Sequence, residues 1–166
     1  MPGNLIYEER ISSTRTEVLF VALTLLLLAM FYWRLTVAGP GVIASICLLS
    51  SLFFAFYALN YRILIIRISA GELHPKFGLF GWTIPLSHVE RAYIDETSLW
   101  RICGAGIHFS TIGGRYRAML NFLEHPRLVV VLKKKRGLVR DVAFSTQRPN
   151  EIMRIIGSST GSDDST

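Results

Sequence analysis

Charged residues are distributed unevenly and divide the chain into a nonpolar N-terminal region and a mixed remainder. Residues 18 to 61 contain one charged side chain, Arg34. Within this region the runs 18–37 and 42–60 are each long enough, at about 1.5 Å per residue, for one helical pass through a bilayer core. The Gly-Pro-Gly sequence at 39–41 predicts a sharp turn between them. The pattern therefore predicts a transmembrane helical hairpin spanning residues 18–60.

The positions of the cationic residues predict the orientation of this hairpin. Arg10 and Arg15 precede the first run, residues 35–41 contain no Lys or Arg, and 15 of the 18 Lys and Arg residues follow residue 61. By the positive-inside rule, both termini lie in the cytoplasm and the chain is a multi-pass protein of the plasma membrane. The first 17 residues then form a cytoplasmic N-terminal arm. A buried helix pair in a soluble protein and a cleaved signal peptide are the alternatives, and a second apolar run disfavours the latter.

The second apolar run carries a stripe of small side chains that would let another helix approach closely. We expect the first helix of the same hairpin to pack there, through its own Ala22 and Ala29. Self-association of two hairpins is the alternative. The stripe consists of Ala44, Ser51, Ala55 and Ala58.

Beyond residue 60 the pattern changes to short β-type runs separated by turn signals, which indicates a domain of antiparallel strands at 61–157. Pro149, Glu151 and Arg154 are typical of a closing helix, which Gly157 is expected to cap. Residues 158–166 are predicted to form a flexible polar tail. The expected strands are 62–68, 72–77, 82–86, 89–94, 106–110, 117–122, 127–134 and 138–144.

Two segments of this domain carry a family resemblance. Residues 76–86 have the sequence KFGLFGWTIPL and are followed by Val89, while Phe144-Ser145-Thr146 precedes the final helix. These residues resemble the Gly-Leu-Phe turn, the Ile-Pro-Leu strand and the ending of bacterial PH-like domains. The resemblance covers 61–157, and members of that family often follow a two-helix membrane anchor. It implies a membrane α-helical hairpin joined to a mainly β PH-like barrel or sandwich with a C-terminal helix.

A run of four cations, Lys133, Lys134, Lys135 and Arg136, is the densest charge cluster. It falls where a hairpin should turn, so it is either a solvated tip or a contact for anionic lipid headgroups. Residues 61–157 carry 15 Lys and Arg against 7 Asp and Glu, a net charge of +8, which favours anionic partners.

Two weaker basic candidates complete the charge analysis. The eukaryotic relatives that the resemblance implies bind inositol phosphates through a basic loop between their first two strands. The corresponding loop here, Ser69-Ala70-Gly71-Glu72, lacks that cluster, which disfavours a stereospecific inositol phosphate pocket. Arg115 and Arg117 with Arg101 form a second candidate patch, with solvation of scattered arginines as the alternative.

Leu79, Phe80 and Trp82 lie on a Gly-flanked turn. They either pack into the domain and the hairpin base, or they insert into the bilayer interface or bind a protein partner.

No catalytic or cofactor-binding motif is recognisable in the sequence. Four histidines and two cysteines are scattered without the spacing of metal ligands, and no phosphate loop or nucleophile elbow is present. A DNA-reading helix and an aromatic stacking motif are also missing, which argues against nucleic acid. The sequence therefore predicts a non-enzymatic, cofactor-free membrane protein that presents an interaction module to a protein partner, to anionic lipids or to both. A structural or accessory subunit of a transport or secretion complex is the alternative, and an enzyme is the least favoured class.

Overall fold

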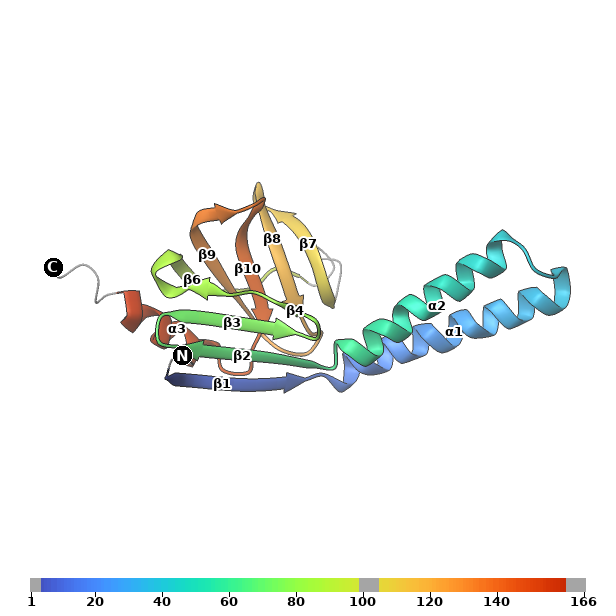
Figure 1. The fold of residues 1–166 in the computed structure, drawn as a ribbon, viewed down its shortest axis with the longest axis horizontal. Coiled ribbons are helices and arrows are strands. Elements are labelled where there is room, and N and C mark those ends of the chain that lie inside the picture. Colours follow the sequence, from blue (N-terminus) through green and yellow to red (C-terminus); the bar gives the residue numbers. More distant parts are fainter. Residues whose placement is uncertain (1–3, 99–104, 161–166) are drawn as a thin grey trace.

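The computed structural model describes residues 4–98 and 105–160 of the chain and contains two long apolar helices, a mainly β domain and a C-terminal helix (Figure 1). The antiparallel helices α1 (Thr14–Ala38) and α2 (Val42–Asn60) project together from one end of the β domain. Helix α3 (Pro149–Thr160) lies at the opposite end of that domain. The predicted succession of two apolar helices, a mainly β region and a C-terminal helix is confirmed.

Helices α1 and α2 are both long and apolar enough to cross a membrane. The Ser13 side chain accepts a hydrogen bond from the Thr16 backbone N–H at 3.1 Å, which satisfies one free donor at the start of α1. Gly39, with φ of 71°, ends α1 in a conformation that favours glycine. Few side chains along either helix are buried, because mainly the strip between the two helices is covered by protein.

The small-residue stripe of α2 lies in the contact between the two helices. Ala44 and Ser51 are buried, Ala55 and Ala58 are half-buried, and Cys47 is a further buried member. The prediction that Ala22 and Ala29 face this stripe is wrong, because both are exposed. The partly buried residues of α1 that face α2 are instead large and recur every fourth position, which keeps them on one helix face. Large side chains of α1 therefore pack against small side chains of α2. These residues of α1 are Leu23, Leu27 and Phe31.

The first sheet joins the helical hairpin directly to the β domain. Strand β1 (Leu5–Ser12) runs into α1, and β2 (Ile63–Ser69) follows α2, so the two helices continue as adjacent antiparallel strands. Strands β3 (Glu72–Phe77), β4 (Phe80–Gly81) and β5 (Ile84–Pro85) complete this sheet, in the order β1-β2-β3-β4 with β5 also paired to β3. The segment expected to be an N-terminal arm therefore supplies an edge strand of the β domain.

The second sheet has the order β6-β9-β10-β8-β7. The prediction of purely antiparallel structure is wrong here, because β8 and β10 are parallel. Strand β9 runs antiparallel to β8 but is not paired with it. Strand β10 lies between the two, antiparallel to β9 and parallel to β8. The strands are β6 (Val89–Asp95), β7 (Gly106–Ile112), β8 (Arg115–Asn121), β9 (Arg127–Arg136) and β10 (Val139–Ser145).

The main core lies between the two sheets and is closed by α3. Fully buried Ile66, Val130 and Phe144 meet there, and Ile152 and Ile156 of α3 join the same cluster. Burial of this amphipathic face gives a short helix the stability it would lack alone in water. A second, smaller cluster on the other face of the second sheet contains Met119, Val129, Val131 and Ala143.

The C-terminal helix is longer than the sequence predicted. Gly157 was expected to cap it, but α3 continues through Gly157 to Thr160. The predicted tail at 158–166 is therefore helical at its start, and its residues 161–166 lie outside the described residues.

Candidate functional site

A continuous column of aromatic rings connects the helical hairpin to the β core. Phe20 of α1 lies 5.5 Å from Tyr57 of α2, ring centre to ring centre, and Tyr57 lies 4.5 Å from Tyr61. Tyr61 then contacts Phe77 at 5.3 Å, and Phe77 contacts Phe122 at 4.9 Å. Aromatic pairs at these separations stabilise beyond their buried area. The helices and the domain are thus joined through packed side chains as well as through the chain itself.

The loops at this end of the domain also contact the helices. The Leu123 backbone N–H donates to Thr16 Oγ1 at 3.2 Å, and a ring nitrogen of His125 lies 3.1 Å from the Ser12 carbonyl oxygen. Gly78 has φ of +59°, and a Cβ atom there would lie 2.3 Å from the Asn60 carbonyl oxygen. Only glycine fits this turn, since both the backbone angle and the close approach exclude a side chain.

Strand β1 is fastened to the far part of the domain by Glu9, a buried carboxylate. It accepts hydrogen bonds from the Tyr7 hydroxyl at 3.1 Å, the Thr146 hydroxyl at 2.6 Å and the Gln147 backbone N–H at 2.8 Å. Burial, together with the neighbouring Glu9 carboxylate, raises the pKa of Tyr7. Glu9 lies just before the N-terminus of α3, where a negative charge is favourable. Residues 61–157 alone would lack this acceptor.

An open groove lies where the outer face of the first sheet meets the ends of the helices. Its volume is about 670 Å³. It contains three cations and one acid, and Ile63 and Ile65 of β2 lie among them. The lining residues are Arg10, Ser12, Glu17, Leu59, Asn60, Arg62, Ile63, Ile65, Lys76 and Gly78. We call this site the junction groove.

Strand register explains the arrangement of two of the cations in the junction groove. Ile65 is paired with Arg10 of β1 on one side and with Lys76 of β3 on the other, and directly paired residues share a face. The Arg10 guanidinium is 2.9 Å from the Glu8 carboxylate, which also accepts from Arg67 at 3.0 Å. These two hydrogen bonds lower the pKa of Glu8.

The two other charged residues of the junction groove lie close to the helix ends. Arg62, directly after Tyr61, pairs with Glu17 of α1 at 2.9 Å. Among the described residues, none forms an ion pair with Lys76. This groove could not be predicted from the sequence, because its charged residues come from four separate segments. The one available signal was that Arg10 and Arg62 flank the apolar hairpin.

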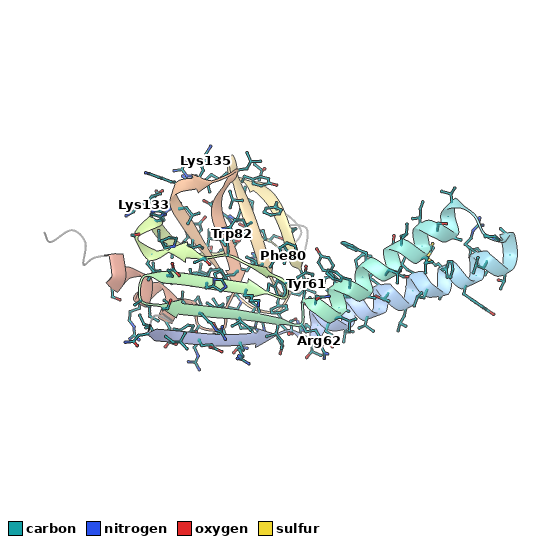
Figure 2. The ribbon with its side chains drawn as sticks, viewed as in Figure 1. Tyr61, Arg62, Phe80, Trp82, Lys133 and Lys135 are labelled. Carbon is teal, nitrogen blue, oxygen red and sulfur yellow. The ribbon has the colours of Figure 1, made fainter. Side chains whose placement is uncertain are left out.

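The aromatic turn divides into two parts. Leu79 and Phe80 are 71% and 57% exposed, and Phe80 lies near the helix ends (Figure 2). Trp82 is partly buried against the main core, in agreement with the packing alternative for that residue.

The cationic run lies at the end of the domain away from the helical hairpin, as Lys133 and Lys135 show in Figure 2. All four residues belong to the end of β9, and the turn comes after them at Gly137. Lys133, Lys134 and Lys135 are exposed, whereas the side chain of Arg136 lies outside the described part of the structure. Lys134 and Lys135 border a cleft of about 510 Å³, together with Thr83, Ile84, Pro85, His88 and Leu132. We call this cleft and Lys133 the distal basic surface.

Arg117, one member of the second candidate patch, does not lie on the surface. Arg117 is buried, and its guanidinium lies 2.8 Å from the Tyr93 hydroxyl and 3.4 Å from both Asp95 and Asp141. Arg127 also lies 3.4 Å from Asp95, so two arginines and two aspartates balance each other within the fold. Such paired burial avoids the cost of an isolated charge. Arg115 is half-buried, and Arg101 lies outside the described residues.

Among residues 4–98 and 105–160, no group of three or more His, Cys, Asp and Glu side chains is placed to hold a metal ion. No protein-family model matches the chain, and no significant match occurs among curated proteins.

Proposed function

We propose that the protein is a non-enzymatic, integral membrane adaptor that presents a PH-like β domain to partners in the cytoplasm. The observation that carries this proposal is the packed junction between two exposed apolar helices and the domain. Because β1 enters the hairpin and β2 leaves it, the N-terminal strand and the β domain lie on one side of any membrane that the hairpin crosses. The excess of cations in this region favours the cytoplasmic side of the plasma membrane.

The position of the distal basic surface supports a role in binding a protein partner. A domain in this orientation directs Lys133 and Lys135, and with them the adjacent Lys134 of β9, away from the lipid and into the aqueous phase (Figure 2). The cleft beside them combines two lysines and a histidine with the apolar side chains of Ile84, Pro85 and Leu132. Electrostatic complementarity then favours a partner with an acidic segment.

The PH-like assignment is part of the proposal and rests on the arrangement of elements. Two packed sheets followed by one closing helix agree with the resemblance of residues 76–86 and 144–146. The parallel β8–β10 pair and the strand before the helical hairpin are departures from the expected pattern. Binding surfaces on such folds depend on individual side chains rather than on the fold itself.

Membrane integration can be tested by sedimentation of the full-length protein after alkaline carbonate extraction. We expect it to remain in the membrane pellet and to require detergent for release. Protein that stays dispersed in buffer without lipid or detergent would overturn the proposal.

Partner binding can be tested by photocrosslinking in intact cells from position 138, since Leu138 is 77% exposed beside the cationic run. We expect one discrete crosslinked protein, which is lost when Lys133, Lys134 and Lys135 are replaced by Glu. A matched probe at Leu5, which is 56% exposed on β1, should not give that product. A crosslink that persists after charge reversal would contradict an acidic partner. Recovery of the chain only as one large complex on mild detergent extraction would favour a structural subunit instead.

A further inference from the structure

We propose that the junction groove binds the headgroup of an anionic glycerophospholipid from the leaflet that the β domain faces. This inference rests on the proposed membrane anchoring and assigns the lipid contact to Arg10, Arg62 and Lys76 rather than to the cationic run of β9. It gives the membrane-facing end of the domain a ligand of its own.

Position is the first argument for a lipid. Leu59 and Asn60 line the groove and belong to the last turn of α2, and Arg62 follows two residues later. Leu59 is 74% exposed on the helix surface that would face acyl chains. Arg62 lies at the base of the helical hairpin in Figure 2. The groove is therefore continuous with the lipid-facing side of α2 and opens at the depth of the headgroups.

Charge is the second argument. Three cations line the groove against one acid, Glu17, which pairs with Arg62. The Arg10 guanidinium also contacts Glu8, a carboxylate that it shares with Arg67, so the region keeps a net positive charge. Arginine donates two parallel hydrogen bonds to a phosphate, and Lys76 adds a cation that has no ion-pair partner among the described residues. Arg10 and Lys76 lie on either side of Ile65 in adjacent strands, so a phosphate above Ile65 is within reach of both side chains.

Apolar surface is the third argument and separates a lipid from a free phosphate. Ile63 is 50% exposed in the groove, and Leu79 is 71% exposed directly after the lining residue Gly78. The glycerol backbone and the first acyl carbons of a lipid would cover these side chains. Inorganic phosphate or glycerol phosphate would leave them in water and would gain none of the free energy that burial of this apolar area supplies.

The test uses the full-length protein, delipidated in a neutral detergent, and native mass spectrometry with added dioleoyl phosphatidylglycerol or dioleoyl phosphatidylcholine. We expect selective retention of phosphatidylglycerol, with an affinity that falls as salt rises. The double variant Arg10→Gln, Lys76→Gln should lower that affinity about 10- to 30-fold, because two cations near the phosphate are lost. Glycerol phosphate, tested as the headgroup alone, should compete weakly.

Two further variants separate loss of the binding site from a change in net charge, and a folding control is applied to every variant. The double variant Lys133→Gln, Lys135→Gln removes an equal number of positive charges, but from the distal basic surface. It should leave phosphatidylglycerol binding unchanged. Ile63→Trp fills the groove without changing any charge and should reduce binding of phosphatidylglycerol. Near-UV circular dichroism of each variant identifies those that retain the native packing.

The outcomes distinguish this inference from the proposed function. Equal losses in the groove variant and in the distal variant would show a nonspecific charge effect and overturn the lipid site. Competition by glycerol phosphate at the same concentration as the lipid would assign the groove to a free phosphate ester. In both cases the adaptor proposal stands if the protein remains in the membrane and keeps its crosslinked partner. Release of the protein into buffer would overturn both proposals.

Discussion

At the end of the β domain next to the helical hairpin, side chains from both helices, both sheets and the β8–β9 loop are interlocked. At the opposite end of the domain, Lys133, Lys134 and Lys135 project from β9 without any comparable packing around them. The first region gives the molecule a fixed shape, and the second is free to meet a partner. Loss of packed side chains in the first region should therefore lower stability, whereas replacement of the exposed lysines in the second should alter binding with little change in stability.

Loss of the central ring of the aromatic column should have the largest effect. Tyr61 is 3% exposed and contacts rings from the helices and from the core. Tyr61→Ala should lower the free energy of unfolding by about 3–5 kcal/mol, as large-to-small changes in cores do. Tyr61→Phe keeps the ring and should cost far less. Chemical denaturation in a neutral detergent measures both, and equal midpoints for Tyr61→Ala and the unchanged protein would contradict the role of the column.

Two glycines in hairpin turns allow a direct comparison of the two ends. Gly78 and Gly137 have φ of +59° and +65°, but a Cβ atom at Gly137 would meet nothing within 4 Å. Gly137→Ala should cost about 1 kcal/mol, the strain of a left-handed residue. Gly78→Ala should cost about 2–4 kcal/mol, because the clash with the Asn60 carbonyl adds to that strain. Similar thermal midpoints for the two variants would show that the junction tolerates displacement.

Neutralising the distal basic surface should change stability very little. The triple variant Lys133→Gln, Lys134→Gln, Lys135→Gln removes exposed side chains only, so the free energy of unfolding should stay within about 0.5 kcal/mol. The crosslink from position 138 should weaken in the same variant. A large loss of stability would show that this end also supports the fold.

Acid titration of Glu8 should produce the smallest effect. Hydrogen bonds from Arg10 and Arg67 lower the pKa of this exposed carboxylate from its ordinary value of 4.5. Its contribution to stability is therefore present above that value and is lost as pH falls through the lowered pKa. Thermal midpoints of Glu8→Gln and the unchanged protein should converge in acid and differ slightly near neutral pH. A constant difference at every pH would contradict this origin.

The elements that could be predicted from the sequence are those whose signal is local. Two apolar runs around Gly-Pro-Gly give α1 and α2 within a few residues, and β-branched runs such as Val129-Val130-Val131 give the strands of the second sheet. The C-terminal helix begins at Pro149, as its N-terminal signals indicated. Each of these elements is determined mainly by residues that are close together in the sequence, so the sequence pattern is sufficient to locate it.

The features that the sequence analysis missed depend on contacts between distant segments. Strand β1 pairs with β2 across the entire helical hairpin, and its inward row includes Glu9, a residue type that usually marks solvent. The partners that make Glu9 acceptable in the interior, Thr146 and Gln147, lie more than a hundred residues away. The junction groove was missed for the same reason. The cationic run was recognised, but the side of the domain on which it lies follows from strand order alone.

The direct connection of α1 and α2 to β1 and β2 makes folding of the domain depend on the packing of the two helices against each other. Some fifty residues separate Ser12 from Ile63, and bringing such distant segments together carries an entropic penalty. If the hairpin inserts into a membrane as proposed, insertion would bring Ser12 and Ile63 close together and so place both strands side by side before the domain folds. A chain that fails to insert would retain β2 with an uncovered edge, which promotes aggregation. On the proposed membrane anchoring, insertion of the hairpin would therefore precede correct folding of the domain.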